Sequence, residues 1–232
     1  MSEVLEYMPL LRSGLITTVL VTVLAALLAL VTAFAFGLAR LSRHRLLSWP
    51  AACLVEFFRG TSLVVQLFWL FFALPFFGIQ LEPLVAGVIA LGLNEGAYAS
   101  EVVRGAISSR PKGQTEAAVA LNMRPGLRMR RILIPQSIPA MLPPMGNVMV
   151  DLLKNSSLVS MVTVADLTFN AGLIRTSTGE TAVVYGLILV VYFLLSLVIS
   201  AIVALLERRY TPAPRRRPLF PALMGRREAV PA

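Results

Sequence analysis

Six ionisable residues stand inside stretches that are otherwise apolar, and they are the side chains with which this chain could act on a solute: Glu56, Arg59, Glu95, Glu101, Asp151 and Lys154. A charge in hydrocarbon is costly, so such groups usually face a bundle interior or a cavity and mark solute paths. Residues three apart on a helix can neutralise each other, which gives a purely structural alternative for the pairs Glu56–Arg59, Glu101–Arg104 and Asp151–Lys154.

Glu95 has no partner at this spacing. Counting about 1.5 Å per residue from Pro83 places Glu95 near the middle of a membrane, and counting inward from Asp166 places Lys154 at a similar depth. A zwitterion carries an ammonium and a carboxylate, so a path with both signs suits it. We therefore predict a substrate path lined by Arg59, Glu95, Lys154, Ser156 and Ser157. Arg59 is expected to lie somewhat nearer the cytoplasm than Glu95 and Lys154. The alternative is a Glu95–Lys154 salt bridge that touches no substrate.

The elements that must position these residues are membrane helices. The 232 residues are 57% hydrophobic and only 14% charged, which is too apolar for an ordinary soluble domain. Uncharged runs cover residues 14–39, 60–81 and 181–206, and each is long enough to cross a bilayer as a helix. We predict an all-α integral membrane protein with one transmembrane domain over residues 1–210, a short interfacial helix within 1–13, and five spans at about 14–39, 50–77, 83–103, 136–164 and 182–206.

The distribution of basic residues predicts the orientation. Lysines and arginines number three in 40–45, seven in 104–131 and seven in 208–227, whereas the opposite side has only Arg12 and Arg175. By the positive-inside rule, the N-terminus lies outside and the C-terminus in the cytoplasm. The net charge of +9 thus comes from clusters that flank spans, which argues against nucleic acid as a partner. We predict that the basic tail, 211–232, is cytoplasmic and disordered.

Prolines are concentrated in the fourth predicted span. Pro139, Pro143 and Pro144 are expected to break its first half, because proline removes a helical hydrogen bond. Interrupted membrane helices must have their free backbone groups satisfied by protein or by a water-lined cavity. We interpret Pro143-Pro144, followed by Gly146-Asn147, as a bend that changes during gating; a static kink is the alternative.

The polar segment 104–135 is predicted to lie in the cytoplasm as two short helices. Thr115 can cap the first helix, with Glu116 in its positive first turn. Asn122 can adopt the left-handed conformation that ends it, and Pro125 suits the first turn of the second. Three small or apolar residues share one face of the first helix by their spacing and would let another protein approach closely: Ala117, Ala120 and Leu121.

This segment resembles the EAA loop of ABC importer permeases. Glu116-Ala117-Ala118, Ile132 and Pro135 match in register, while Asn122 stands in place of a Gly and Ile134 in place of a Leu. Three further segments resemble the polar amino acid branch of these permeases. They are residues 57–68, Ala97-Tyr98 with Glu101 and 104–107, and Leu153-Lys154-Asn155-Ser156-Ser157-Leu158. The resemblance covers roughly residues 12–210.

The resemblance implies a subunit of an importer in the bacterial inner membrane that moves a polar amino acid by alternating access. The implied partners are an ATPase subunit dimer that holds ATP and Mg, a second permease chain, identical or homologous, and a periplasmic substrate-binding protein. Coupling to the ATPase would fall to Glu116, Ala117, Ala118, Ala120, Leu121, Asn122, Arg124 and Pro125. The loop arginines Arg124, Arg128, Arg130 and Arg131 would meet acidic groups or membrane lipids; a loop whose arginines only set topology is the alternative.

The residues themselves argue against an enzyme. The only lysines are Lys112 and Lys154, and neither belongs to a Gly-x-x-x-x-Gly-Lys-Ser/Thr loop. One cysteine, Cys53, and one histidine, His44, offer no metal cluster or catalytic triad. We therefore predict no catalytic, cofactor or metal site in this chain. The alternative function is an ATP-independent channel or membrane scaffold whose cytoplasmic loop binds another protein; a lipid transferase comes third.

Overall fold

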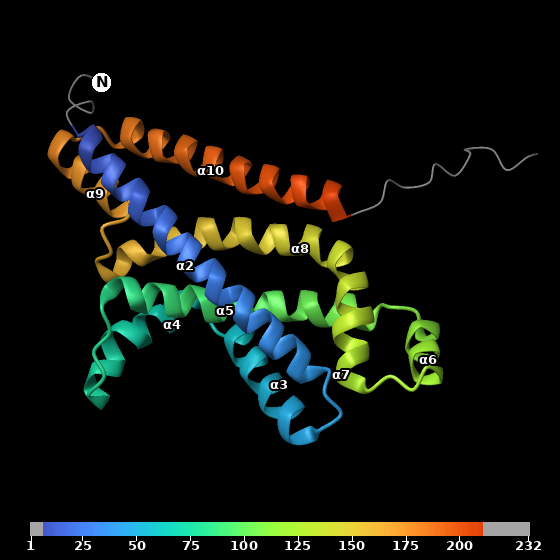
Figure 1. Cartoon of the computed structure of the whole chain (residues 1–232). Coiled ribbons are helices and arrows are strands. Elements are labelled where there is room, and N and C mark those ends of the chain that lie inside the picture. Colours follow the sequence, from blue (N-terminus) through green and yellow to red (C-terminus); the bar gives the residue numbers. More distant parts are fainter. Residues whose placement is uncertain (1–6, 211–232) are drawn as a thin grey trace, which may run out of the picture.

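The computed structural model describes residues 7–210, which form helices and their connections with no strand in that range (Figure 1). The α-helices are α2 (Met8–Arg40), α3 (Arg45–Gly60), α4 (Leu63–Phe68), α5 (Pro83–Ser108), α6 (Lys112–Ala120), α7 (Pro125–Arg128), α8 (Ile134–Asn155), α9 (Leu167–Thr178) and α10 (Thr181–Tyr210). Short π and 3-10 segments join them: η1 (Trp69–Ala73), η2 (Leu74–Phe77), η3 (Met129–Leu133) and η4 (Ser156–Val162).

Helices α2 and α5 pack together through small residues. A Cβ atom on Gly92 would lie 2.6 Å from the Leu28 side chain, and one on Gly96 would lie 3.2 Å from the Ala29 backbone. The Thr32 hydroxyl, on the same face of α2, donates to the carbonyl of Gly92 at 3.3 Å. Small residues are typical of membrane helix interfaces because they let the backbones approach.

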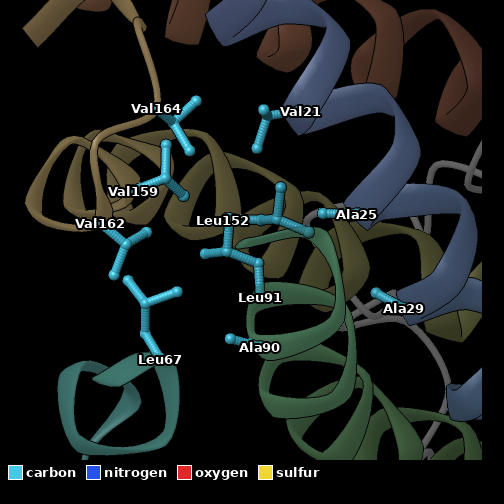
Figure 2. Close-up of a cluster of buried hydrophobic side chains, with 10 residues drawn as sticks. All are labelled: Val21, Ala25, Ala29, Leu67, Ala90, Leu91, Leu152, Val159, Val162 and Val164. Carbon is cyan, nitrogen blue, oxygen red and sulfur yellow. The ribbon is translucent and has the colours of Figure 1, made fainter. Parts of the chain in front are cut away.

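A cluster of buried aliphatic side chains joins this pair to the rest of the molecule. It brings Leu67 of α4 and Leu91 of α5 together with Leu152 of α8 and with Val159 and Val162 of η4 (Figure 2). All five are nearly inaccessible to solvent. The cluster fixes the short α4 and the end of α8 against α5, and these are the elements that carry the polar residues described below.

Three of the predicted spans fall within helices that are longer than the predicted ranges. The span at 14–39 lies within α2, the one at 83–103 lies within α5, and the one at 182–206 lies within α10. The predicted interfacial helix over 1–13 falls partly outside the described residues, and residues 8–13 belong to α2 instead of a separate helix. The predicted disordered tail, 211–232, also lies outside them.

The second span, predicted as one helix over 50–77, is wrong in that respect. Helix α3 ends at Gly60, and the next two residues, Thr61 and Ser62, adopt extended backbone conformations. The helical segment Leu63–Phe77 then follows at an angle of 103° to α3. Gly60 weakens a helix, and short hydroxyl side chains compete for backbone hydrogen bonds. These residues therefore permit a break at this position.

The predicted proline break in the fourth span is also wrong. Helix α8 continues through Pro139, Pro143 and Pro144, although its ribbon curves in the yellow-green first half (Figure 1). The interruption comes later, where Thr163 has a φ of 65° and α9 follows the preceding helix at 55°. The sequence interpretation missed α9. Asp166 caps the start of this helix, because its carboxylate accepts a hydrogen bond from the Phe169 backbone amide at 2.8 Å.

Two helices in residues 7–210, α2 and α10, are long and apolar enough to cross a membrane alone. Two bent pairs raise the number to four if each forms one span: α3 with 63–77, and 125–162 with α9. Helix α5 is less apolar because it carries Asn94 and Glu95, but its neighbours α2, α3 and α8 enclose much of it. The all-helical membrane class is thereby supported, and the count of five spans stays a prediction.

Candidate functional site: a polar cavity and an exposed helix

A polar cavity of about 420 Å³ lies between the α3–α4 break, α5 and the end of α8. Its lining includes the two residues of the break and polar side chains from both helices: Thr61, Ser62, Leu63, Asn94, Glu95, Tyr98, Val148, Asp151, Lys154 and Asn155. The volume is in the range of small-ligand sites. The cavity therefore has the size and the donors and acceptors to hold a small polar solute.

Side chains satisfy the backbone carbonyls that the break leaves free. The Phe58 carbonyl accepts hydrogen bonds from Gln66 Nε2 and from Asn94 Nδ2, each at 2.9 Å. Asn94 Nδ2 also donates to Gln66 Oε1 at 3.1 Å, and Tyr98 donates to the Arg59 carbonyl at 3.2 Å. A helix end without water needs such partners, so α5 holds the break in place.

Replacing Asn94 by Leu is expected to destabilise the protein by about 1–3 kcal/mol, because Gln66 Oε1 and the Phe58 carbonyl lose a buried donor. The thermal unfolding of the purified protein measures this. Asn147→Leu, the same change at an exposed position of α8, is the control and should leave the unfolding temperature nearly unchanged. Equal unfolding temperatures for both variants would contradict a stabilising role for the Asn94 amide.

Glu95 and Lys154, which were predicted to lie at similar depths, both line this cavity. The alternative Glu95–Lys154 salt bridge is absent from the described residues: Glu95 Oε1 accepts from Asn155 Nδ2 at 2.7 Å, and Lys154 Nζ lies 3.5 Å from Asp151 Oδ1. Glu95 is only 5% exposed, whereas the Lys154 and Asp151 side chains are each 60% exposed. The predicted Asp151–Lys154 pair is thus confirmed, and Glu95 is left with an amide as its partner.

The other three predicted path residues lie outside the cavity lining. The Arg59 guanidinium stacks over Tyr98 at 5.3 Å from the ring centre and pairs with Glu56 at 3.7 Å. Ser156 is fully buried and donates to the Leu153 carbonyl, while Ser157 donates to the Lys154 carbonyl. The structure therefore places Arg59 beside the cavity through Tyr98 and turns both hydroxyls toward their own helix.

An ion-pair cluster joins α2, α3 and α5 beyond the cavity. Arg40, at the end of α2, contacts Glu101 of α5 and lies 3.5 Å from Glu56 of α3. Arg104 pairs with Glu101 at 2.7 Å. The spacing of three residues correctly predicted the Glu101–Arg104 and Glu56–Arg59 pairs. It could not predict Arg40, whose partners come from other helices.

The exposed helix α6 stands apart from the bundle (Figure 1). Ala118 is its one buried residue, and Ala117, Ala120 and Leu121 are exposed. Gln136 of α8 tethers the segment. Its backbone carbonyl accepts a hydrogen bond from the Arg110 guanidinium at 3.1 Å, and its side-chain amide donates to Gln114 Oε1 at 3.2 Å. The face predicted for docking is therefore open, while the buried Ala118 and the contacts of Gln136 hold α6 to the molecule.

The end of α6 confirms one prediction. Asn122 has a φ of 54°; its amide donates to the Val119 carbonyl at 2.8 Å, and the Met123 amide donates to the Ala118 carbonyl at 3.0 Å. This is the Schellman arrangement, in which an Asn can stand in for the usual Gly.

Two other predictions for this segment are wrong. Thr115 is not the cap, because the helix already begins at Lys112 after Pro111 and Glu116 falls in its second turn. Pro125 does start a helix, but that helix continues without a gap through η3 into α8. The predicted loop at 104–135 therefore contains one separate helix, α6, between the last turn of α5 and the first turns of the α7–α8 segment.

The comparison with protein families decides what kind of protein carries these features. Residues 25–212 match the family of the binding-protein-dependent transport system inner membrane component. The chain belongs to this family. It is also 42% identical, over 212 residues and 89% of each chain, to a probable amino-acid ABC transporter permease protein of Sinorhizobium fredii. The protein is thus an inner membrane component and an ABC transporter permease of the amino-acid group.

Two further relatives agree with this assignment. The L-cystine transport system permease protein of Bacillus subtilis is 35% identical to this permease over 88% of each chain. A solved structure, described as an amino acid ABC transporter with histidines, superposes with a TM-score of 0.82 at 36% identity, covering 89% of this permease and 96% of that chain. These names refer to different amino acids, so they do not identify the substrate of this permease.

The sequence interpretation assigned only two of the ten cavity-lining residues of this permease, Glu95 and Lys154, to the substrate path. Thr61, Ser62, Asn94, Tyr98 and Asn155 had not been assigned to the path, although each lines the cavity. Two signals were available: Asn94 and Asn155 directly neighbour Glu95 and Lys154 in sequence, and Thr61-Ser62 is a polar pair inside an uncharged run. What the sequence lacked was the break that brings this pair against α5.

Proposed function

We propose that this permease is the membrane-spanning subunit of an ATP-driven importer that moves a polar amino acid or a related small solute by alternating access. It forms five spans, with the N-terminus outside and the C-terminus in the cytoplasm, and it works with a second permease chain. A periplasmic binding protein delivers the solute, and a separate ATPase dimer, which binds ATP and Mg, drives the cycle. The substrate then passes the cavity lined by Glu95 and Lys154.

The observation that carries this proposal is the exposed apolar surface of α6 and of the residue that follows it, Leu121. Leu121 is 75% exposed and Val119 is 58% exposed, in a segment otherwise rich in arginine. Apolar side chains of this kind outside a membrane are typical of a surface that meets another protein. Because α6 is held by Gln136 at the start of α8, a displacement of α6 would act on the helix that carries Asp151 and Lys154.

Transport should require ATP hydrolysis. We expect the permease to co-purify with an ATPase subunit in stoichiometric amounts. Proteoliposomes that contain this complex and the binding protein should take up labelled L-arginine or L-glutamine with ATP, and at least about tenfold less with a non-hydrolysable analogue. The channel or scaffold alternative predicts the opposite: no ATPase in the purified material, or uptake that proceeds equally without nucleotide.

A further inference from the structure

The cavity lining carries an uneven set of charges. Two carboxylates, from Glu95 and Asp151, and one ammonium, from Lys154, are its acidic and basic groups. The lining therefore has a net negative charge. Because the cavity walls are protein and the surroundings are apolar helices, this charge is screened less than one on an open surface.

Glu95 supplies the unbalanced charge. Lys154 lies 3.5 Å from Asp151, so these two groups offset each other. Glu95 accepts one hydrogen bond from the neutral amide of Asn155 at Oε1, and within residues 7–210 its Oε2 takes part in no hydrogen bond or ion pair. A nearly buried carboxylate without a cation is costly, so its position suits a site that a cationic ligand completes.

Among the described residues, the arginines nearest to the cavity along α3 and α5 already have carboxylate partners. Arg59 pairs with Glu56, and Arg104 pairs with Glu101. Arg40 contacts the same two carboxylates from α2. None of these arginines lines the cavity. These arginines therefore leave Glu95 without a cationic partner among the described residues.

We propose that this cavity selects an amino acid with a cationic side chain, a guanidinium or an ammonium, and that Glu95 binds that group. Asn155 positions the Glu95 carboxylate by holding Oε1. The match is complete in sign: two carboxylates meet the side-chain cation and the α-ammonium, and Lys154 meets the α-carboxylate. A neutral zwitterion would leave one carboxylate unmatched. This inference rests on the proposed function, since it names the substrate class of the same path.

Direct binding tests the charge preference without the binding protein, whose own selectivity would mask it. The permease purified with its ATPase subunit is titrated with L-arginine and with L-citrulline, which has nearly the same shape but a neutral ureido group. Arginine should bind at least about tenfold more tightly, because a charge-assisted hydrogen bond is worth on the order of 1.5 kcal/mol or more. Equal affinities would overturn the inference, and this measurement needs no variant.

Glu95→Gln assigns the preference to one side chain. The amide keeps the shape and can still accept from Asn155, so citrulline affinity should stay within about twofold while the arginine advantage disappears. Glu82→Gln, the same change at the exposed residue before α5, should retain the advantage. An arginine advantage that survives in Glu95→Gln overturns the role of Glu95.

The two levels of the proposal fail differently. If wild-type protein binds arginine, citrulline and L-glutamine alike, the cavity accepts amino acids but does not select cations, so only this inference is overturned. If wild-type protein binds none of the three at millimolar concentration, the cavity is not an amino-acid path, and that part of the proposed function is overturned as well.

Discussion

Replacing Ala120 by Trp should reduce ATP-driven amino-acid uptake by more than about tenfold while the permease still folds and reaches the membrane. Ala120 and Ala117 are exposed on α6, whereas Ala118 is buried, so a large side chain at either exposed position has room in the isolated chain. It has no room if an ATPase subunit packs closely on this face. A misfit at the centre of an interface costs on the order of 2 kcal/mol, which corresponds to about a thirtyfold loss of binding.

Uptake into proteoliposomes and co-purification of the ATPase measure the two sides of this effect. Both should fall together in Ala120→Trp and in Ala117→Trp. The matched control is Ala182→Trp, the same substitution at an exposed alanine in the first turn of α10. That variant should transport normally. Undiminished ATP-driven uptake by folded Ala120→Trp would show that this face does not couple the permease to the proposed ATPase subunit.

The parts of the fold that were predictable from the sequence are those set by local pattern. The uncharged runs 14–39 and 181–206 lie within α2 and α10, because only a helix satisfies its own backbone in hydrocarbon. Asn122 was found for a similar reason, since its left-handed conformation is a property of one residue and its neighbours. Pairs three apart on a helix were also found, as for Asp151 with Lys154.

The parts that were missed depend on partners distant in sequence. The break at Thr61-Ser62 is held by Asn94, which lies more than thirty residues away. Pro143 and Pro144 led to the opposite error, since they predicted a break where α8 continues. A helix can curve around a missing hydrogen bond when its neighbours support it.

The site shows the same division. The sequence placed Glu95 and Lys154 at one depth, and both line one cavity. It could not show that Lys154 would be neutralised by Asp151 and that Asn155 would take the place of a cation beside Glu95. Spacing along one helix gives candidate pairs, whereas the choice among them requires the angles between helices.

Replacing Gly96 by Val should remove most of the folded permease. A Cβ atom at Gly96 would lie 2.9 Å from Thr32 Cβ and 3.2 Å from Ala29 Cα, with the Thr32 hydroxyl closer still. Val adds two further methyl groups, so α2 and α5 would have to separate. Overpacking of this kind costs about 1–3 kcal/mol and sometimes more, and the contact concerned lies at the centre of the bundle, next to Glu95.

The amount of permease in membranes and the Tm of the purified protein measure this loss. The control is Gly105→Val on the same helix, where a Cβ atom would meet nothing within 4 Å. Because Val is a better helix former than Gly, that variant should be as stable as the wild type or slightly more so. If Gly96→Val and Gly105→Val gave the same yield and Tm, the close approach of α2 and α5 would not be what holds the two helices together.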